Sequence, residues 1–180
     1  MGLEKKREDI LDFAIKDPVG IELGVATGEF SSFILSRKNV KYWYSVDMWA
    51  GDRGHDVNQY IEAVTRLLPY KQKNTVLRLK FEEALSVFPN NYFDFIYVDG
   101  YAHTGQEDGK TLTDWWPKLK PGGIFAGDDY DPFWAPTVNA VDKFIEKYKT
   151  QNSGLKIFDF KKEGRWGAYP SWYTKKNEKN

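Results

Sequence analysis

Cysteine is absent from the 180 residues of this sequence. Its absence excludes disulfide bonds, thiolate metal ligands and cysteine nucleophiles, and it is compatible with a reducing compartment. The chain also has no apolar run that approaches the length of a membrane span, and its first residues, MGLEKKREDI, are charged where a signal peptide would be apolar. We therefore expect a cytoplasmic protein that has no membrane partner.

An excess of charge of either sign is also missing. Lys and Arg together number 26, as do Asp and Glu, and no basic block appears outside the two ends of the chain. A nucleic-acid partner is therefore not expected. The length suits one domain that buries roughly 70% of its unfolded surface without the help of disulfide bonds.

The stretch at residues 20–30, GIELGVATGEF, is the strongest local signal in the chain. The residues before its first turn are nearly all apolar, as in a buried strand of a parallel sheet. Gly24 and Gly28 permit a tight turn with positive φ, and they let a ligand lie against bare backbone. Residues 29–38 then have helical spacing of apolar side chains, with Thr27 available as N-cap. This succession of strand, glycine turn and helix is typical of a Rossmann-like small-molecule site.

The charges of this turn favour a cationic ligand. Glu22 precedes the turn and Glu29 lies in the first turn of the helix, where both would repel a pyrophosphate. The pattern resembles motif I of the class I S-adenosylmethionine-dependent methyltransferases, E/D-x-G-x-G-x-G, with Ala26 in place of the middle glycine. The resemblance implies that S-adenosylmethionine, which leaves as S-adenosylhomocysteine, binds at Glu22, Gly24, Ala26, Thr27, Gly28, Phe30 and Ser31. A glycine turn alone is a weak signal, and a purely structural turn stays open as an alternative.

Two further segments extend the expected cofactor site. The strand expected over residues 41–46 ends at Asp47, about 20 residues after the glycines, where an acid grips a ribose diol. Met48 follows and either flanks the adenosine or packs in the core. By resemblance of position within the superfamily, Phe81 and Glu82 are expected to contact the adenine.

Acidic residues follow the next two expected strands. The strand over residues 93–98 ends at Asp99, and the strand near residues 124–126 delivers Asp128 and Asp129 to the same edge. Clustered carboxylates are costly unless a cation joins them, and oxygen ligands suit Mg²⁺ or Mn²⁺. Such an ion would lower the pKa of a substrate hydroxyl. Alternatively, Asp128 and Asp129 only cap backbone amides in the following turn.

The joint occurrence of ELGVATGEFSS, VDMW, IYVDGYAH, WWPKLKPGG and GDDY resembles the metal-dependent macrocin and rhamnosyl O-methyltransferase group over residues 19–130. The resemblance implies a single-domain, Rossmann-like α/β fold. Its seven-stranded, mostly parallel sheet would have the order 3-2-1-4-5-7-6, with helices on both faces. It also implies that Asp99, Asp128 and Asp129 hold the metal and that Asp99 takes part in catalysis.

The sequence departs from this group at the expected general base. Sugar methyltransferases of the macrocin type have a D-x-D pattern after the fourth strand, with the second Asp as base. In this sequence Tyr101 stands at the position of that second Asp. We hypothesise that His103 accepts the hydroxyl proton instead, although a lone histidine can also be structural.

The expected acceptor is a hydroxyl of a sugar or a glycosylated small molecule. Flat aromatic faces pack well against sugars, although they can equally be core residues. The candidate substrate contacts are Arg53, His55, Tyr101, Tyr130, Trp134 and Trp166. A phenolic or catechol-type acceptor stays open.

Two functions of other classes also stay open. A nicotinamide-dependent oxidoreductase would share the glycine turn and Asp47 but not the glycine spacing. A silent cofactor-binding interaction module would bind the cofactor without methyl transfer. In domain terms we expect an N-terminal helix within residues 1–18 that covers the sheet, a methyltransferase domain over 19–173 and a polar tail at 174–180. A homodimer is compatible with these expectations.

Overall fold

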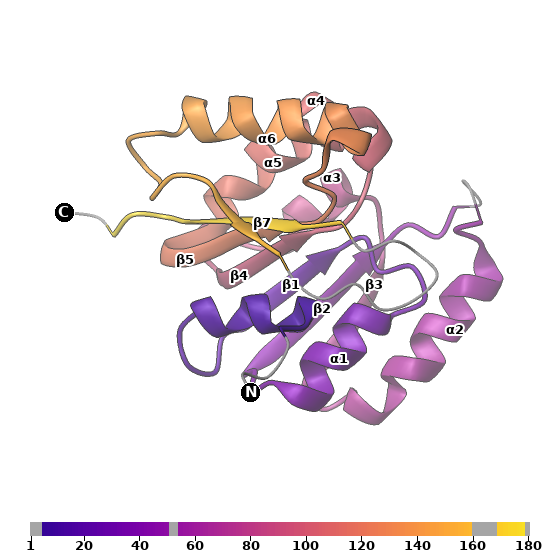
Figure 1. The fold of residues 1–180 in the computed structure, drawn as a ribbon. Coiled ribbons are helices and arrows are strands. Elements are labelled where there is room, and N and C mark those ends of the chain that lie inside the picture. Colours follow the sequence, from indigo (N-terminus) through magenta and orange to yellow (C-terminus); the bar gives the residue numbers. More distant parts are fainter. Residues whose placement is uncertain (1–4, 51–53, 160–168, 179–180) are drawn as a thin grey trace.

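The computed structural model describes residues 5–50, 54–159 and 169–178 and contains one seven-stranded sheet (Figure 1). The strand order is β3-β2-β1-β4-β5-β7-β6, as predicted. The first five strands pair in parallel, and β7 is antiparallel to both of its neighbours. The strands are β1 Val19–Leu23, β2 Tyr42–Asp47, β3 Asn74–Arg78, β4 Phe93–Val98, β5 Leu119–Gly127, β6 Lys156–Phe158 and β7 Ser171–Lys175.

Helices cover both faces of this sheet. In Figure 1, α1 and α2 lie against one face together with the indigo N-terminal 3-10 helix η1, whereas α3, α5 and α6 lie against the other. The α-helices are α1 Glu29–Arg37, α2 Val57–Leu67, α3 Phe81–Ala84, α4 Gly105–Asp108, α5 Lys110–Trp115 and α6 Ala135–Lys147. The 3-10 helices are η1 Arg7–Phe13, η2 Leu68–Tyr70, η3 Leu85–Val87, η4 Ala102–Thr104, η5 Trp116–Lys118 and η6 Pro132–Trp134. In the described part of the chain, no helix combines the length and the apolar character that crossing a bilayer requires.

The central strand β4 links the two halves of the core. All six of its residues are buried. Because successive side chains of a strand point to opposite faces, Phe95 and Tyr97 pack in the cluster beside α1, while Ile96 and Val98 pack in the cluster beside α5 and α6. Burial on both faces explains why the segment FDFIYV has no polar alternation except Asp94.

The N-terminal segment differs from its expected α-helix. It forms the 3-10 helix η1, which ends before Ala14, whose backbone is extended. Ile10 and Leu11 are buried in the cluster beside α1. Phe13 stacks on Tyr173 of β7, with ring centroids 4.5 Å apart. The helix therefore lies across one face of the sheet.

Apolar residues at helical spacing predict a helix with a buried stripe at Val57, Tyr60, Ile61, Val64, Leu67 and Leu68. Helix α2 forms there, but most of this stripe is not core. Only Ala63 and Leu67 of this helix are buried, whereas Val57 is 50% and Ile61 56% exposed. The expectation that the whole stripe is core is therefore wrong. At the other end of the chain, β7 runs to Lys175, so the strand includes the first two residues of the predicted tail.

Candidate functional site

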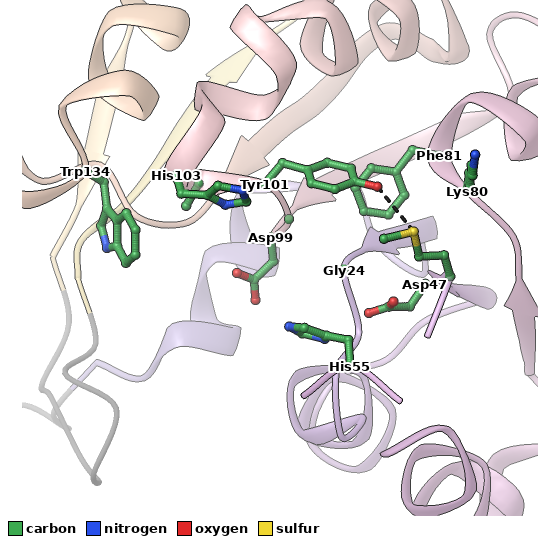
Figure 2. Close-up of a pocket in the computed structure, with 12 residues that line it drawn as sticks. Gly24, Asp47, His55, Lys80, Phe81, Asp99, Tyr101, His103 and Trp134 are labelled. Atoms are coloured by element: carbon green, nitrogen blue, oxygen red, sulfur yellow. Dashed lines mark hydrogen bonds between the residues drawn. The ribbon is translucent and has the colours of Figure 1, made fainter. Parts of the chain in front are cut away.

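A cavity of about 340 Å³ lies at the carboxyl ends of β1, β2 and β4 (Figure 2). In an open α/β sheet, this edge is where ligands bind beside the point at which the strand order reverses. Nine residues predicted for the site line the cavity: Gly24, Asp47, Met48, His55, Phe81, Asp99, Tyr101, His103 and Trp134. Lys80, Gly100 and Ala102 line it too, without having been predicted.

The glycine turn after β1 forms part of the cavity wall. Gly24 has a φ of +99°, and a Cβ there would collide with the backbone carbonyl of Asp99, so the ends of β1 and β4 meet in direct backbone contact. Gly28, with a φ of 81°, is the N-cap of α1 and no side chain caps the helix, so the prediction of Thr27 as N-cap is wrong. Ala26 also has a positive φ, of 49°. The turn is thus a tightly constrained stretch of backbone beside the ligand space.

Asp47 holds this turn in place. Its Oδ2 accepts hydrogen bonds from the amides of Val25 (2.9 Å) and Ala26 (3.0 Å), and its Oδ1 accepts one from the amide of Trp49 (3.0 Å). The indole of Trp49 donates in turn to the carbonyl of Ala26 at 2.8 Å. The carboxylate therefore organises the glycine turn from the end of β2, and its contact with a ribose stays a prediction.

Glu22 lies beneath the turn and does not line the cavity. Its carboxylate accepts a hydrogen bond from the Ser31 hydroxyl, which itself accepts one from the Trp43 indole at 2.8 Å. Desolvation by burial raises the pKa of Glu22 well above its ordinary value, so burial favours the neutral acid. Phe30 is also beneath the turn, stacked on Tyr97 with centroids 4.3 Å apart. These three predicted cofactor contacts, Glu22, Ser31 and Phe30, are buried and do not line the cavity.

An apolar wall closes the cavity on the side of α3. The ring of Phe81 meets the ring of Tyr101 edge-on at 5.1 Å, and the Tyr101 hydroxyl donates to the sulfur of Met48 at 3.6 Å. Tyr101 holds a positive φ of 59°, which is costly for a residue with a side chain. Glu82 is exposed on α3 and does not line the cavity.

The three predicted metal ligands lie at the ends of β4 and β5, but the guanidinium of Arg7 lies between two of them, where the metal ion was expected. Its Nη2 pairs with Oδ2 of Asp99 and lies 3.1 Å from Oδ2 of Asp128. Desolvation raises the pKa of Asp99 to about 7 and that of Asp129 to about 8. Among the described residues, no three His, Cys, Asp or Glu side chains are placed to hold a metal ion. The side chains as placed do not fit the predicted Mg²⁺ or Mn²⁺, because a guanidinium already contacts two of the three carboxylates.

The alternative role for Asp128 and Asp129 is not seen either. The turn before α6 is capped by Asp131, whose Oδ1 accepts from the amide of Phe133 at 2.9 Å. Asp128 instead accepts from the hydroxyl of Ser171 at 3.1 Å.

The remaining predicted residues divide around the rim. In Figure 2, His103 and Trp134 lie on one side of the cavity, His55 and Asp47 on another, and Asp99 between them. His103 is exposed on η4, whose Ala102 carbonyl accepts a hydrogen bond from Thr137 of α6 at 2.9 Å.

Three of the predicted substrate contacts do not contribute to the described cavity. The Tyr130 hydroxyl donates to Asp142 at 2.8 Å, and Tyr130 does not line the cavity. Arg53 and Trp166 lie outside the described residues.

Solved structures with the same fold come from several bacteria. The chain is similar to a putative methyltransferase from Streptococcus mutans in complex with SAH (TM-score 0.67, 14% identity, 96% of this chain and 99% of that one). It is also similar to a putative rRNA methylase from Clostridium thermocellum (0.68, 12%, 96% and 94%). A third similar structure is a SAM-dependent O-methyltransferase from Thermotoga maritima (0.64, 13%, 96% and 64%). No match is found among curated proteins.

Sequence comparison agrees with this fold. Residues 21–130 match a family described as methyltransferase domain, which covers more than half of the chain and includes the glycine turn, Asp47, Asp99 and both acids after β5. The seven-stranded sheet with its antiparallel β7 is the sheet that the resemblance to S-adenosylmethionine-dependent methyltransferases implied. The chain therefore belongs to the methyltransferase domain family and has the Rossmann-like fold of S-adenosylmethionine-dependent methyltransferases.

Proposed function

We propose that this protein transfers the methyl group of S-adenosylmethionine to a hydroxyl of a small molecule, and that this molecule is a sugar or carries one. The observation that carries the proposal is the cavity at the strand ends. There the bare backbone of Gly24, two carboxylates and an apolar wall surround a single space. The similar Streptococcus mutans protein was solved with SAH, which supports the same donor here.

The chemistry of the cavity fits the two ends of this donor. S-adenosylmethionine supplies a methyl group on a positively charged sulfonium, and it also carries an ammonium and a flat adenine. Phe81, Tyr101 and Met48 offer the apolar and aromatic surface that suits the adenine. Asp47 places negative charge beside the cationic parts.

The acceptor hydroxyl must lose its proton during methyl transfer, and His103 is our proposed base. Its imidazole lies at the cavity and on the same side as Trp134 (Figure 2). A ring nitrogen of His103 accepts the proton from the hydroxyl as the new C–O bond forms, while the bond between the sulfonium sulfur and the methyl carbon breaks and neutral S-adenosylhomocysteine leaves. Because the carboxylates at the ends of β4 and β5 do not fit a divalent metal as they are placed, the proposed reaction includes no metal step.

An aromatic cluster at the rim supports a sugar acceptor. Trp134 lines the cavity and stands perpendicular to the rings of Phe133 and Tyr169, at 5.1 and 6.0 Å. Phe133 stacks on Tyr169 and is 70% exposed. Exposed flat rings are surfaces against which the apolar face of a sugar packs.

The test is a transfer assay with methyl-labelled S-adenosylmethionine and a panel of glycosides and simple phenols, each with added Mg²⁺ and with EDTA. We expect labelled glycoside at equal rates in both conditions. Trp134→Ala should raise the KM for the glycoside about tenfold, because it removes the aromatic face. Tyr130→Phe is the matched control, since its hydroxyl bonds to Asp142 away from the cavity, and it should leave KM unchanged. Label on phenols alone, or on no acceptor, would contradict the proposal.

A further inference from the structure

The N-terminal helix η1 delivers one charged side chain to the acidic edge of the sheet. Its own position is set by packing, since Ile10 is fully buried and Phe13 stacks on Tyr173 of β7. A second ion pair joins Glu8 of η1 to Arg37 of α1. Arg7 is the first residue of the same helix. Because η1 is held in place by these contacts, the position from which Arg7 reaches the strand ends is fixed.

The guanidinium of Arg7 is bound on several sides. Nη2 contacts the carboxylates of both Asp99 and Asp128, and Nε donates to the Tyr97 hydroxyl at 2.9 Å. Its Cζ atom lies over the ring of Phe30, 4.7 Å from the centroid, in a cation–π contact.

A second path of hydrogen bonds joins Arg7 to Asp128. The Tyr97 hydroxyl lies 2.7 Å from the hydroxyl of Ser171, and that hydroxyl donates to Oδ1 of Asp128 at 3.1 Å. Arg7, Tyr97, Ser171 and Asp128 thus form a closed ring of polar contacts. A metal ion at the same carboxylate oxygens would have to displace the guanidinium and break this ring.

We infer that Arg7 is the built-in cation of the acidic strand ends and holds the position that a divalent metal would need. The protein then takes up no divalent cation between Asp99 and Asp128. Because Asp99 also lines the cavity, Arg7 is a positioning residue for that wall. The inference concerns cation occupancy only, so its tests need no methyl donor or acceptor and can fail independently of the proposed function.

The first test titrates the full-length wild-type protein with Mn²⁺ and follows the free ion by electron paramagnetic resonance. We expect equimolar Mn²⁺ to give the same signal amplitude with the wild-type protein as without protein. Any loss of signal from binding elsewhere on the protein should be equally large with Asp128→Asn. Stoichiometric binding by the wild type that Asp128→Asn abolishes would overturn the inference, because it would show that a metal displaces Arg7.

The second test is a double-mutant cycle in thermal melting. Arg7→Gln should lower Tm by roughly 5 °C, because it leaves two partly buried carboxylates without their cation. The double variant with Arg7→Gln and Asp128→Asn should show a fall in Tm clearly smaller than the sum of the falls for the two single variants. The matched control is Arg37→Gln, which breaks the ion pair between Glu8 of η1 and Arg37 and should be additive with Asp128→Asn. Additive shifts for Arg7→Gln and Asp128→Asn would overturn the inference.

Discussion

At the scale of single residues, the site depends first on a position that tolerates no side chain. Gly24 combines a φ of +99° with direct contact between its Cα and the backbone of Asp99. Gly54 has a similar φ, of +89°, but nothing lies within 4 Å of a Cβ placed there. The two glycines therefore separate the cost of an unfavourable φ from the cost of a collision.

We predict that Gly24→Ala lowers the free energy of unfolding by about 2–4 kcal/mol and abolishes S-adenosylhomocysteine binding, because strands β1 and β4 must move apart. Gly54→Ala should cost about 1 kcal/mol and leave binding unchanged, since only φ is strained. Urea unfolding and ligand titration of both variants measure this difference. Equal effects of the two substitutions would mean that the contact between strand ends is unimportant.

His103 carries the residue-scale prediction for chemistry. His103→Ala should lower kcat about 100-fold and leave the Kd for S-adenosylhomocysteine unchanged, because the imidazole is proposed to move a proton and not to bind the donor. His55→Ala, on another side of the cavity, is the control and should keep kcat within a few-fold. Near-normal turnover of His103→Ala would remove His103 as the base.

At the scale of elements, two buried aspartates accept backbone hydrogen bonds at opposite ends of the sheet's strands. Asp47 is the last residue of β2 and accepts from the turn amides of Val25 and Ala26. Asp94 is the second residue of β4 and accepts from the amide of Val19 at 2.9 Å and from Lys120 at 2.8 Å. Asp47 stabilises the end of the sheet at which the cavity lies, and Asp94 stabilises the opposite end.

We predict that Asp47→Asn weakens S-adenosylhomocysteine binding at least about tenfold, because one amide oxygen cannot accept both from the turn amides of Val25 and Ala26 and from the amide of Trp49. Asp94→Asn should lower Tm without changing the ligand Kd. Calorimetric titration of both variants, with melting curves, makes the comparison. If both variants bind like the wild type, the turn does not need Asp47.

The elements themselves were predictable where burial alone sets the pattern. Residues 93–98 form β4 at the predicted bounds, because an apolar run between turn residues has few alternatives. The spacing of Leu112, Trp115, Trp116 and Leu119 predicts one helical face, but Leu119 begins β5, since Pro117 allows only the short η5 after α5. The burial of the apolar stripe of α2 is smaller than the sequence predicts, because periodicity shows which residues share a face and not how much of that face is covered.

At the scale of the whole molecule, the convergence of the site was predictable but its cation was not. Parallel strands bring Gly24, Asp47 and Asp99 to one edge, so their positions after apolar runs were sufficient to group them. Arg7 meets Asp99 across 92 residues, from a charged N-terminal stretch in which no pattern distinguishes it from its neighbours. Only the folded chain shows that pairing.

The cavity at the ends of β1, β2 and β4 is the proposed site of the methyl donor. The most direct test is a calorimetric titration of the wild-type protein with S-adenosylhomocysteine, with NADH titrated under the same conditions. We predict one site per chain with a Kd in the micromolar range for S-adenosylhomocysteine and no detectable heat from NADH. Absence of S-adenosylhomocysteine binding, or tighter binding of NADH, would contradict the account.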